Sequence, residues 1–133
     1  MSRVGPLKLK IMLFCGDSTA MGPGKAELLE AIDRGGSISA AGRHMGMSYR
    51  RAWTLVDMMN RSWTEPVVKT SVGGIGKGGA RLTAFGARLL HAYRDLENRL
   101  MVAAKEGPFS EFEHQLLEVP RPSATIPRAA EDA

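Results

Sequence analysis

The stretch GSISAAGRHMGMSYRRAW constrains the fold of this chain more than any other. Ser37 is suited to cap a short helix over residues 38–45, because a serine hydroxyl accepts hydrogen bonds from the free amides of a first helical turn. Gly46 then breaks this helix, and Ser48 is suited to cap another helix that runs to about Arg61. The sequence therefore predicts two helices that meet at a three-residue corner.

The residues of this corner divide into a buried and an exposed side. Gly42 stands where the first helix must let the second pass close by, since a side chain there would hold the two apart. The side predicted to be buried carries Met45, Met47, Ala52, Val56 and Met59. The side predicted to be exposed, at the front of the second helix, carries Tyr49, Arg50, Arg51 and Thr54.

Strands and a further helix are predicted before the corner. Residues 7–14 alternate apolar and polar side chains, which predicts an edge strand with one solvent-facing side. The following GDSTAMGPG predicts a loop. Pro23 favours the first turn of a helix that Gly35 and Gly36 end.

After the corner, residues 67–72 and 80–84 have the composition of strands, and the intervening GGIGKGG predicts a hairpin with a long glycine-rich tip. A helix is predicted from Phe85 to about Lys105, then a short helical segment and a flexible tail. We predict a winged helix-turn-helix domain with a dimerisation helix at 1–106, of α+β, mostly α class, followed by a short segment at 107–133.

The predicted long helix carries an apolar seam with heptad-like spacing. This layout is typical of a helix that pairs with its twin, so the seam is the predicted homodimer interface. Packing on Leu7, Leu9 and Ile11 of the same chain is the alternative. The candidate dimerisation residues are Leu89, Tyr93, Leu96, Leu100 and Ala103.

Charge is distributed unevenly along the chain. The net charge of the whole chain is +4, but residues 34–94 contain ten Lys and Arg and only two acidic residues, a net charge of +8. A basic block of this kind favours a polyanionic partner, although a solvated basic surface would produce the same composition.

Cys15 is the only cysteine, which excludes an internal disulfide and a cysteine-based metal cluster and fits a reducing cytoplasm. The apolar run IMLFC is too short for a secretory signal, and no stretch is long enough to span a bilayer. The sequence predicts a cytoplasmic chain that does not contact a membrane.

Double-stranded DNA is the predicted partner. The front of a second helix of this kind enters the major groove, where an arginine fork matches guanine O6 and N7, while basic side chains and helix amides hold phosphate. The candidate DNA-binding residues are Ser37, Ser39, Arg43, Ser48, Tyr49, Arg50, Arg51, Thr54, Lys69, Lys77 and Arg81.

Three segments, GPGKAELLEAID, GSISAAGRHMGMSYRRAWTLVDMMN and GGIGKGGARLTAFG, stand in this order and resemble the DNA-binding domain of the molybdate-responsive transcriptional regulator (ModE) family over roughly residues 5–100. The resemblance implies that residues 37–61 read DNA, that residues 67–84 form the wing, and that the helix after Phe85 joins a dimer interface. We expect the molybdate-binding modules of that family to be missing from this chain. Gly42 stands where the family more often has alanine.

Other motifs carry less weight. Gly74, Gly76 and Gly79 satisfy G-x-G-x-x-G, but the motif should open a helix, whereas ARLTA follows as a strand. The three histidines lack metal-ligand spacing, and no catalytic arrangement is suggested, so we expect neither a metal, nor a cofactor, nor an enzyme. Trp53 and Trp63 are predicted to be core residues, with stacking on a base as the alternative.

The leading hypothesis is a dimeric, sequence-specific transcriptional regulator linked to molybdenum metabolism. A protein–protein interaction module on the same scaffold, without direct metal sensing, is the alternative, with the apolar seam as its docking surface. Three alternatives are open for its regulation: a separate effector protein, an oxyanion at the dimer interface, and constitutive action.

Overall fold

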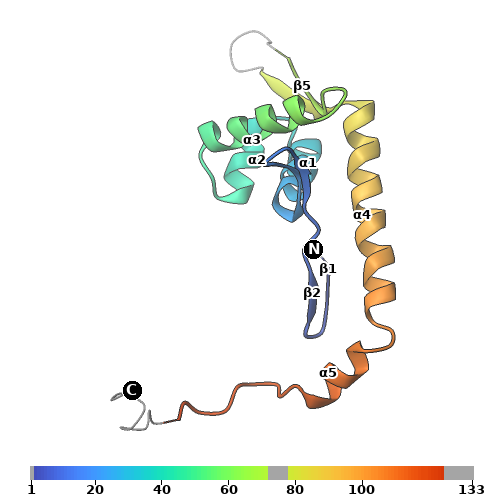
Figure 1. Ribbon diagram of the computed structural model, residues 1–133. Helices are drawn as coiled ribbons and strands as arrows, with labels where there is room; N and C mark the ends of the chain where they lie inside the picture. The colour runs from blue at the N-terminus through green and yellow to red at the C-terminus, as the bar shows by residue number, and fades with distance from the viewer. Residues whose placement is uncertain (1, 72–77, 125–133) are drawn as a thin grey trace. The chain divides into compact units, whose positions relative to one another are not determined.

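The computed structural model describes residues 2–71 and 78–124, and the chain is a mixed α+β protein in which helices predominate (Figure 1). It divides into a compact unit over Met1–Ala103 and a second unit over Ala104–Ala133. This confirms the predicted α+β, mostly helical class. The helices are α1 (Pro23–Gly35), α2 (Ile38–Met45), α3 (Tyr49–Ser62), α4 (Ala84–Ala104) and α5 (Phe109–Gln115).

Short strands form three separate antiparallel pairs within the described residues. The pairs are β1 (Ser2–Val4) with β2 (Leu7–Leu9), β3 (Leu13–Cys15) with β4 (Ser18–Met21), and β5 (Val68–Ser71) with β6 (Gly79–Leu82). The β5–β6 pair confirms the predicted hairpin. Residues 72–77, which include the candidate residue Lys77, lie outside the described residues.

The prediction of one strand over residues 7–14 followed by a loop is wrong, because the structure has two hairpins there. The chain turns at Gly5, with φ of 56°, and at Gly16, with φ of 60°, and this left-handed conformation favours glycine. Apolar alternation identifies extended backbone but not the strand that it pairs with. It therefore did not reveal that β2 pairs back onto β1 while β3 pairs forward onto β4.

Helix α1 provides the centre of the core. It begins at Pro23 and ends at Gly36, whose φ is 74° and whose amide donates to the Ile32 carbonyl over 2.8 Å, as the sequence predicted. The apolar side of α1 packs against α2 and against strand β6 of the β5–β6 hairpin. Its buried residues are Ala26, Leu28, Leu29, Ala31 and Ile32.

The corner between α2 and α3 confirms the capping pattern read from the sequence. The Ser37 hydroxyl accepts from the Ala40 amide at 3.0 Å, and Gly46 ends α2 with φ of 69°. A Cβ atom added at Gly42 would lie 3.2 Å from the Met47 carbonyl oxygen, so the two helices pass as closely as predicted. Ala52, Val56 and Met59 are buried, and Met45 and Met47 pack beside them.

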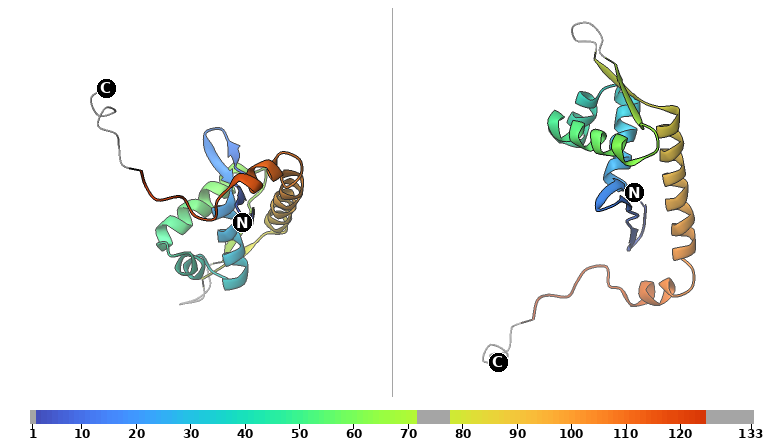
Figure 2. Two further views of the ribbon diagram at one scale, coloured as in Figure 1. Left: turned by 90° about the horizontal axis from the view of Figure 1, so that it is seen from below. Right: turned by 45° about the horizontal axis from the view of Figure 1, so that its top comes forward.

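The β5–β6 hairpin lies beside the helices of the core (Figure 2), and hydrogen bonds attach both of its sides to them. The Asn60 side chain of α3 accepts from the Val67 and Val68 amides at 2.8 and 3.0 Å and donates to the Val68 carbonyl at 3.1 Å. On the other strand, the Ala80 amide donates to the Gly36 carbonyl at 2.8 Å. These bonds set the position of the hairpin relative to α2 and α3.

Helix α4 packs on the same core along part of its length. Gly86 lies so close to Val67 that an added Cβ would overlap the Val67 carbonyl. About two turns further on, the Tyr93 hydroxyl donates to the Ile11 carbonyl at 2.8 Å. In the part of the chain that the structure describes, no helix, α4 included, is long and apolar enough to cross a membrane.

Candidate nucleic-acid interface

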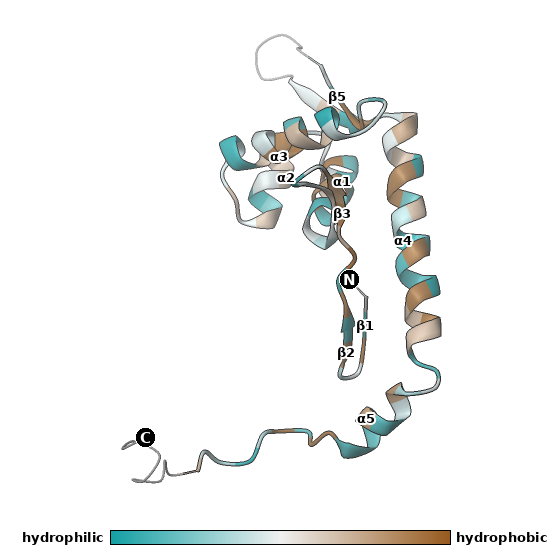
Figure 3. Ribbon diagram, in the orientation of Figure 1, coloured by the Kyte–Doolittle hydropathy of each residue, from teal (hydrophilic) through white to brown (hydrophobic). Residues whose placement is uncertain are grey.

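The first turns of α3 present polar and cationic side chains to solvent. Tyr49 is 56% exposed, and Arg50, Arg51 and Thr54 are exposed as well, while Ala52 beneath them is buried. The arrangement follows from the helical repeat, which turns Ala52 and Val56 inward and the other side chains outward. In the hydropathy colouring of Figure 3, this end of α3 is predominantly polar.

Cationic charge at this end of α3 is not neutralised within the described residues. Neither Arg50 nor Arg51 forms an ion pair there, whereas Arg61 in the last turn pairs with Asp57 at 3.1 Å. The Ser48 hydroxyl accepts from the Arg51 amide at 3.1 Å, and the other first-turn amides add partial positive charge. The surface therefore suits an anion or the acceptor edge of a base.

Lys25 extends this basic surface, and sequence reasoning missed it. Two effects lower the pKa of Lys25: burial is the larger, and the positive charge of Arg51 is the smaller. The two cations therefore lie close enough to repel each other. One residue is in the first turn of α1 and the other in α3. Their proximity depends on how the two helices pack, which no local sequence pattern records.

Thr54 and the two capping serines have their hydroxyls engaged with the backbone. The Thr54 hydroxyl donates to the Arg50 carbonyl at 2.8 Å, which leaves its oxygen as an acceptor, and the residue as a whole is exposed. Ser37 is half-buried, and its hydroxyl serves as the α2 cap. Ser39 and Arg43, also on α2, are exposed.

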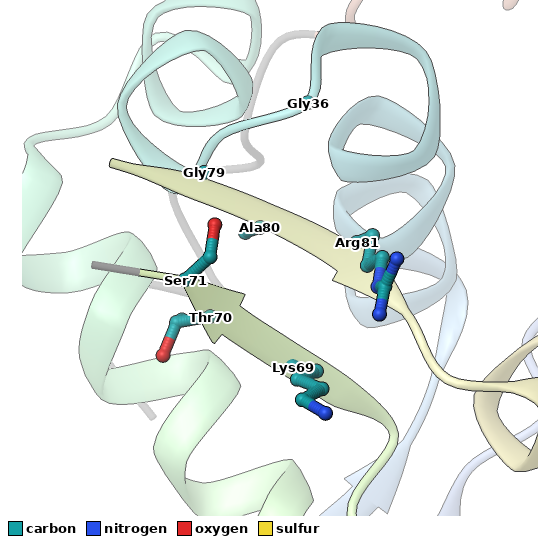
Figure 4. A pocket seen from close by; sticks show the side chains of 7 residues that line it. All are labelled: Gly36, Lys69, Thr70, Ser71, Gly79, Ala80 and Arg81. Carbon is teal, nitrogen blue, oxygen red and sulfur yellow. The ribbon is translucent and has the colours of Figure 1, made fainter. Parts of the chain in front are cut away.

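The hairpin carries a second cationic pair. Lys69 on β5 lies opposite Arg81 on β6 in the register, and both side chains are exposed (Figure 4). Like charges directly opposite one another destabilise an isolated sheet, and a bound anion removes that repulsion. They border an open hollow of about 330 Å³ together with Gly36, Thr70, Ser71, Gly79 and Ala80.

A larger hollow, of about 570 Å³, brings three segments of the chain together. Its walls come from the start of α2, from the exposed side of α3 and from the hairpin. The lining residues are Ser37, Ile38, Ser39, Tyr49, Trp53, Thr70, Ser71, Gly78 and Gly79. Three of the candidate DNA-binding residues, Ser37, Ser39 and Tyr49, thus border the same concave surface.

The prediction that Trp53 is a core residue is wrong, since its side chain is 48% exposed at this hollow. On α3, Trp53 lies at the edge between the buried face, which includes Ala52 and Val56, and the exposed face. The helical spacing alone therefore does not determine whether its side chain is buried or exposed. Trp63 agrees with the prediction, because it packs against the core and its indole N–H donates to the Ala20 carbonyl at 3.3 Å.

The apolar seam of α4 is divided by the structure. Tyr93 is buried in its own chain and Leu89 packs against the core, so these two candidate dimerisation residues make contacts within their own chain. Leu96 and Leu100 are 37% and 42% exposed, and Ala103 is exposed too. The heptad spacing located the stripe but not the contacts of its first half, such as the hydrogen bond from Tyr93 to the Ile11 carbonyl.

The remaining motifs add no site. Among residues 2–71 and 78–124, no group of three His, Cys, Asp or Glu side chains is placed to hold a metal ion. Gly74 and Gly76 lie outside the described residues, and Gly79 begins the strand β6 rather than a helix. A dinucleotide-binding motif would instead open a helix, so Gly79 does not fit that function.

Sequence comparison relates the chain to regulators and molybdenum-binding proteins. No family model matches it. It is 43% identical over 79 residues to the molybdenum transport protein ModE of Azotobacter vinelandii, covering 59% of this chain and 29% of that protein. It is 38% identical over 87 residues to the DNA-binding transcriptional dual regulator ModE of Escherichia coli, covering 65% of this chain and 31% of that protein.

The chain is homologous to the N-terminal part of the ModE regulators. It is also 48% identical over 77 residues to the molybdenum-pterin-binding protein MopB of Rhodobacter capsulatus, which covers 58% of this chain and 28% of that protein. The chain thus spans about a third or less of the length of these relatives. Their names describe regulators, a transport protein and a binding protein, and none of these names describes an enzyme.

Proposed function

We propose that this chain is a winged helix-turn-helix, sequence-specific DNA-binding transcriptional regulator. The observation that carries the proposal is the start of α3, where Tyr49, Arg50, Arg51 and Thr54 are exposed together beside a hairpin with its own opposed cations. In this assignment α2 and α3 are the helix-turn-helix and β5–β6 is the wing. Homology to ModE regulators supports the same assignment.

Each part of this surface has a role suited to its chemistry. The α3 arginines would enter the major groove and read guanine through paired N–H donors. Lys69 and Arg81 would lie along one phosphate backbone, and Lys25 and Arg43 would contact phosphate from the helical side. Lys77, at the wing tip, belongs to the same proposal on the strength of its position in the sequence.

The names of the relatives give the biological setting of the proposal. They are named as a ModE regulator and as a molybdenum-pterin-binding protein, so we assign this chain to the control of genes connected with molybdenum, in the cytoplasm. Its signal would come from an oxyanion or from a separate effector protein. Isothermal titration with molybdate and with tungstate distinguishes these two sources, since a separate effector predicts no tight binding of either anion.

Replacing Arg50 or Arg51 by alanine should weaken binding to a specific site by about 1 to 3 kcal/mol each, because a paired contact to guanine is lost. The melting temperature should stay unchanged, since both side chains are exposed. The target is first selected from random duplexes with the wild-type chain, and affinity is then measured by fluorescence anisotropy on target and scrambled DNA.

Arg61→Ala is the matched control, an exposed arginine in the last turn of the same helix that is paired with Asp57. Its affinity for the target should change by less than about 0.5 kcal/mol, because recognition helices read bases with their N-terminal turns. Selection that recovers no preferred sequence would contradict the proposed function. Loss of the melting transition in either α3 variant would assign those arginines to the fold.

Lys69→Ala should lower affinity for target and scrambled duplexes alike. One phosphate contact fewer should reduce the slope of log affinity against log salt by about one unit. The same titration tests the alternative of a protein interaction module, which the exposed Leu96 and Leu100 favour. If the chain binds its partner through an apolar docking surface, its affinity should change little with salt concentration. A change in sequence preference of Lys69→Ala would mean instead that the wing reads bases.

A further inference from the structure

Two aromatic side chains lie exposed one turn apart on α3. Tyr49 and Trp53 are four residues apart, which places them on the same side of the helix. Each leaves about half of its surface in solvent, so the two together form one exposed aromatic surface rather than a single scattered side chain. They form an amphipathic pair beside Arg50, which is three residues before Trp53 and therefore neighbours it on the helix surface.

The recess in front of this pair is formed by fixed parts of the fold. Both aromatics line the 570 Å³ hollow with Thr70 and Ser71 of β5. Asn60 holds β5 against α3 at 2.8 and 3.0 Å, and Gly36 holds β6 at 2.8 Å. The residues that line the hollow can therefore stay in place while DNA approaches Tyr49 and Trp53.

The chemistry of the duplex narrows what such a surface can recognise. Among the four bases, the thymine 5-methyl is the one apolar group that the major groove presents, and apolar side chains contact it directly. In the proposed function, Lys69 and Arg81 on the hairpin and Lys25 on α1 already contact the phosphates. We infer that Trp53, supported by Tyr49, packs against a thymine methyl and makes the chain select thymine beside the base read by Arg50.

This inference rests on the proposed function and adds a specificity residue to it. The consequence is a preference at one position of each half-site that no hydrogen bond provides. Removing the methyl alone should therefore weaken binding as far as the methyl is buried. Burial of one such carbon corresponds to about a fourfold change in affinity.

The test replaces thymine by deoxyuridine, one position at a time, in the duplex selected with the wild-type chain. Deoxyuridine removes the methyl and keeps every hydrogen-bonding group. At one position per half-site, wild-type affinity should fall about fourfold. Trp53→Ala should bind the unmodified duplex about tenfold more weakly and should no longer distinguish thymine from deoxyuridine there.

Two variants control for folding and for loss of an aromatic group as such. Trp53→Phe keeps an apolar ring and should retain part of the thymine preference. Phe112→Ala removes an aromatic of comparable exposure from α5, in the second unit, and should leave both affinity and thymine preference unchanged. Melting curves should match the wild type for all three variants.

The inference is overturned if no thymine is sensitive, or if Trp53→Ala keeps the wild-type sensitivity. A contact of the indole with deoxyribose instead of the methyl would produce that second result together with a loss of affinity. In both cases selective binding of the target over scrambled DNA would still support the proposed function. If the wild-type chain shows no selective binding, both the inference about thymine and the proposed function are wrong.

Discussion

Replacing Arg94 by methionine is expected to lower the free energy of unfolding by about 3 kcal/mol at neutral pH. Arg94 on α4 bonds to Glu30 of α1 at 2.6 and 3.2 Å and to Glu97 at 2.7 Å. The Glu97 side chain is only 3% exposed, and its second oxygen already lacks a partner among the described residues. Without Arg94, a buried carboxylate would lose its cation. We place the effect at the lower end of the range for buried pairs because Arg94 is 22% exposed.

Arg99→Met is the matched control on the same helix. Arg99 pairs with Asp95 at 2.9 Å, but its side chain is 79% exposed, and exposed pairs of this kind contribute less than about 1 kcal/mol. Urea unfolding followed by circular dichroism gives both values. Equal destabilisation by the two variants, or none by Arg94→Met, would show that the Arg94 cluster does not stabilise the fold.

The pH dependence of this difference follows from Glu30. The hydrogen bond from Arg94 holds the pKa of Glu30 below its ordinary value of 4.5. A lowered folded-state pKa stabilises the fold above the ordinary value, and this contribution is lost as pH falls through the folded-state pKa. The gap between wild type and Arg94→Met should therefore narrow below pH 4.5, and a constant gap would contradict the role of Glu30.

Elements with local signals were predictable from the sequence. The α2–α3 corner depends on Ser37, Gly46 and Ser48, whose effects act within one helical turn. Glycine spacing and strand composition likewise sufficed for β5 and β6. The N-terminal hairpins were not predictable, because pairing of β1 with β2 depends on partner choice and the alternating pattern carries no such information.

The candidate site was predictable as far as one helix face determines it. The exposure of Tyr49, Arg50 and Arg51 follows from the helical repeat, whereas the approach of Lys25 to Arg51 arises between two helices. The Arg94 cluster joins residues 64 positions apart. Tyr93 was assigned to an interface because the heptad pattern shows which side of a helix is apolar, but it does not show what covers that side.

We propose that the chain forms a homodimer through α4, and the Leu96→Asp, Leu100→Asp double variant is then expected to be a monomer. These side chains remain exposed on α4 after Leu89 and Tyr93 have packed on their own chain, and with Ala103 they form a continuous stripe. In a symmetric dimer each stripe would face its copy, so every aspartate would be buried without a partner. Each such burial costs several kcal/mol, more than a small interface can absorb.

Val102→Asp is the matched control, since Val102 is 59% exposed on the same helix. It follows Leu96 by six residues, which at about 100° per residue places it roughly 120° away from the stripe around the helix. This variant should remain dimeric and should bind DNA as the wild type does. Sedimentation at micromolar concentration compares the three chains, and melting curves confirm that each is folded.

Dimerisation and DNA binding are expected to fail together in the double variant. A helix-turn-helix dimer reads two half-sites about 34 Å apart, or a multiple of that distance, and a single unit loses the affinity that the second one adds. The double variant should therefore no longer protect a palindromic site from nuclease at concentrations where wild type and Val102→Asp do. A wild-type chain that sediments as a monomer would reject the α4 interface, and its affinity for DNA would then have to come from the contacts of one unit alone.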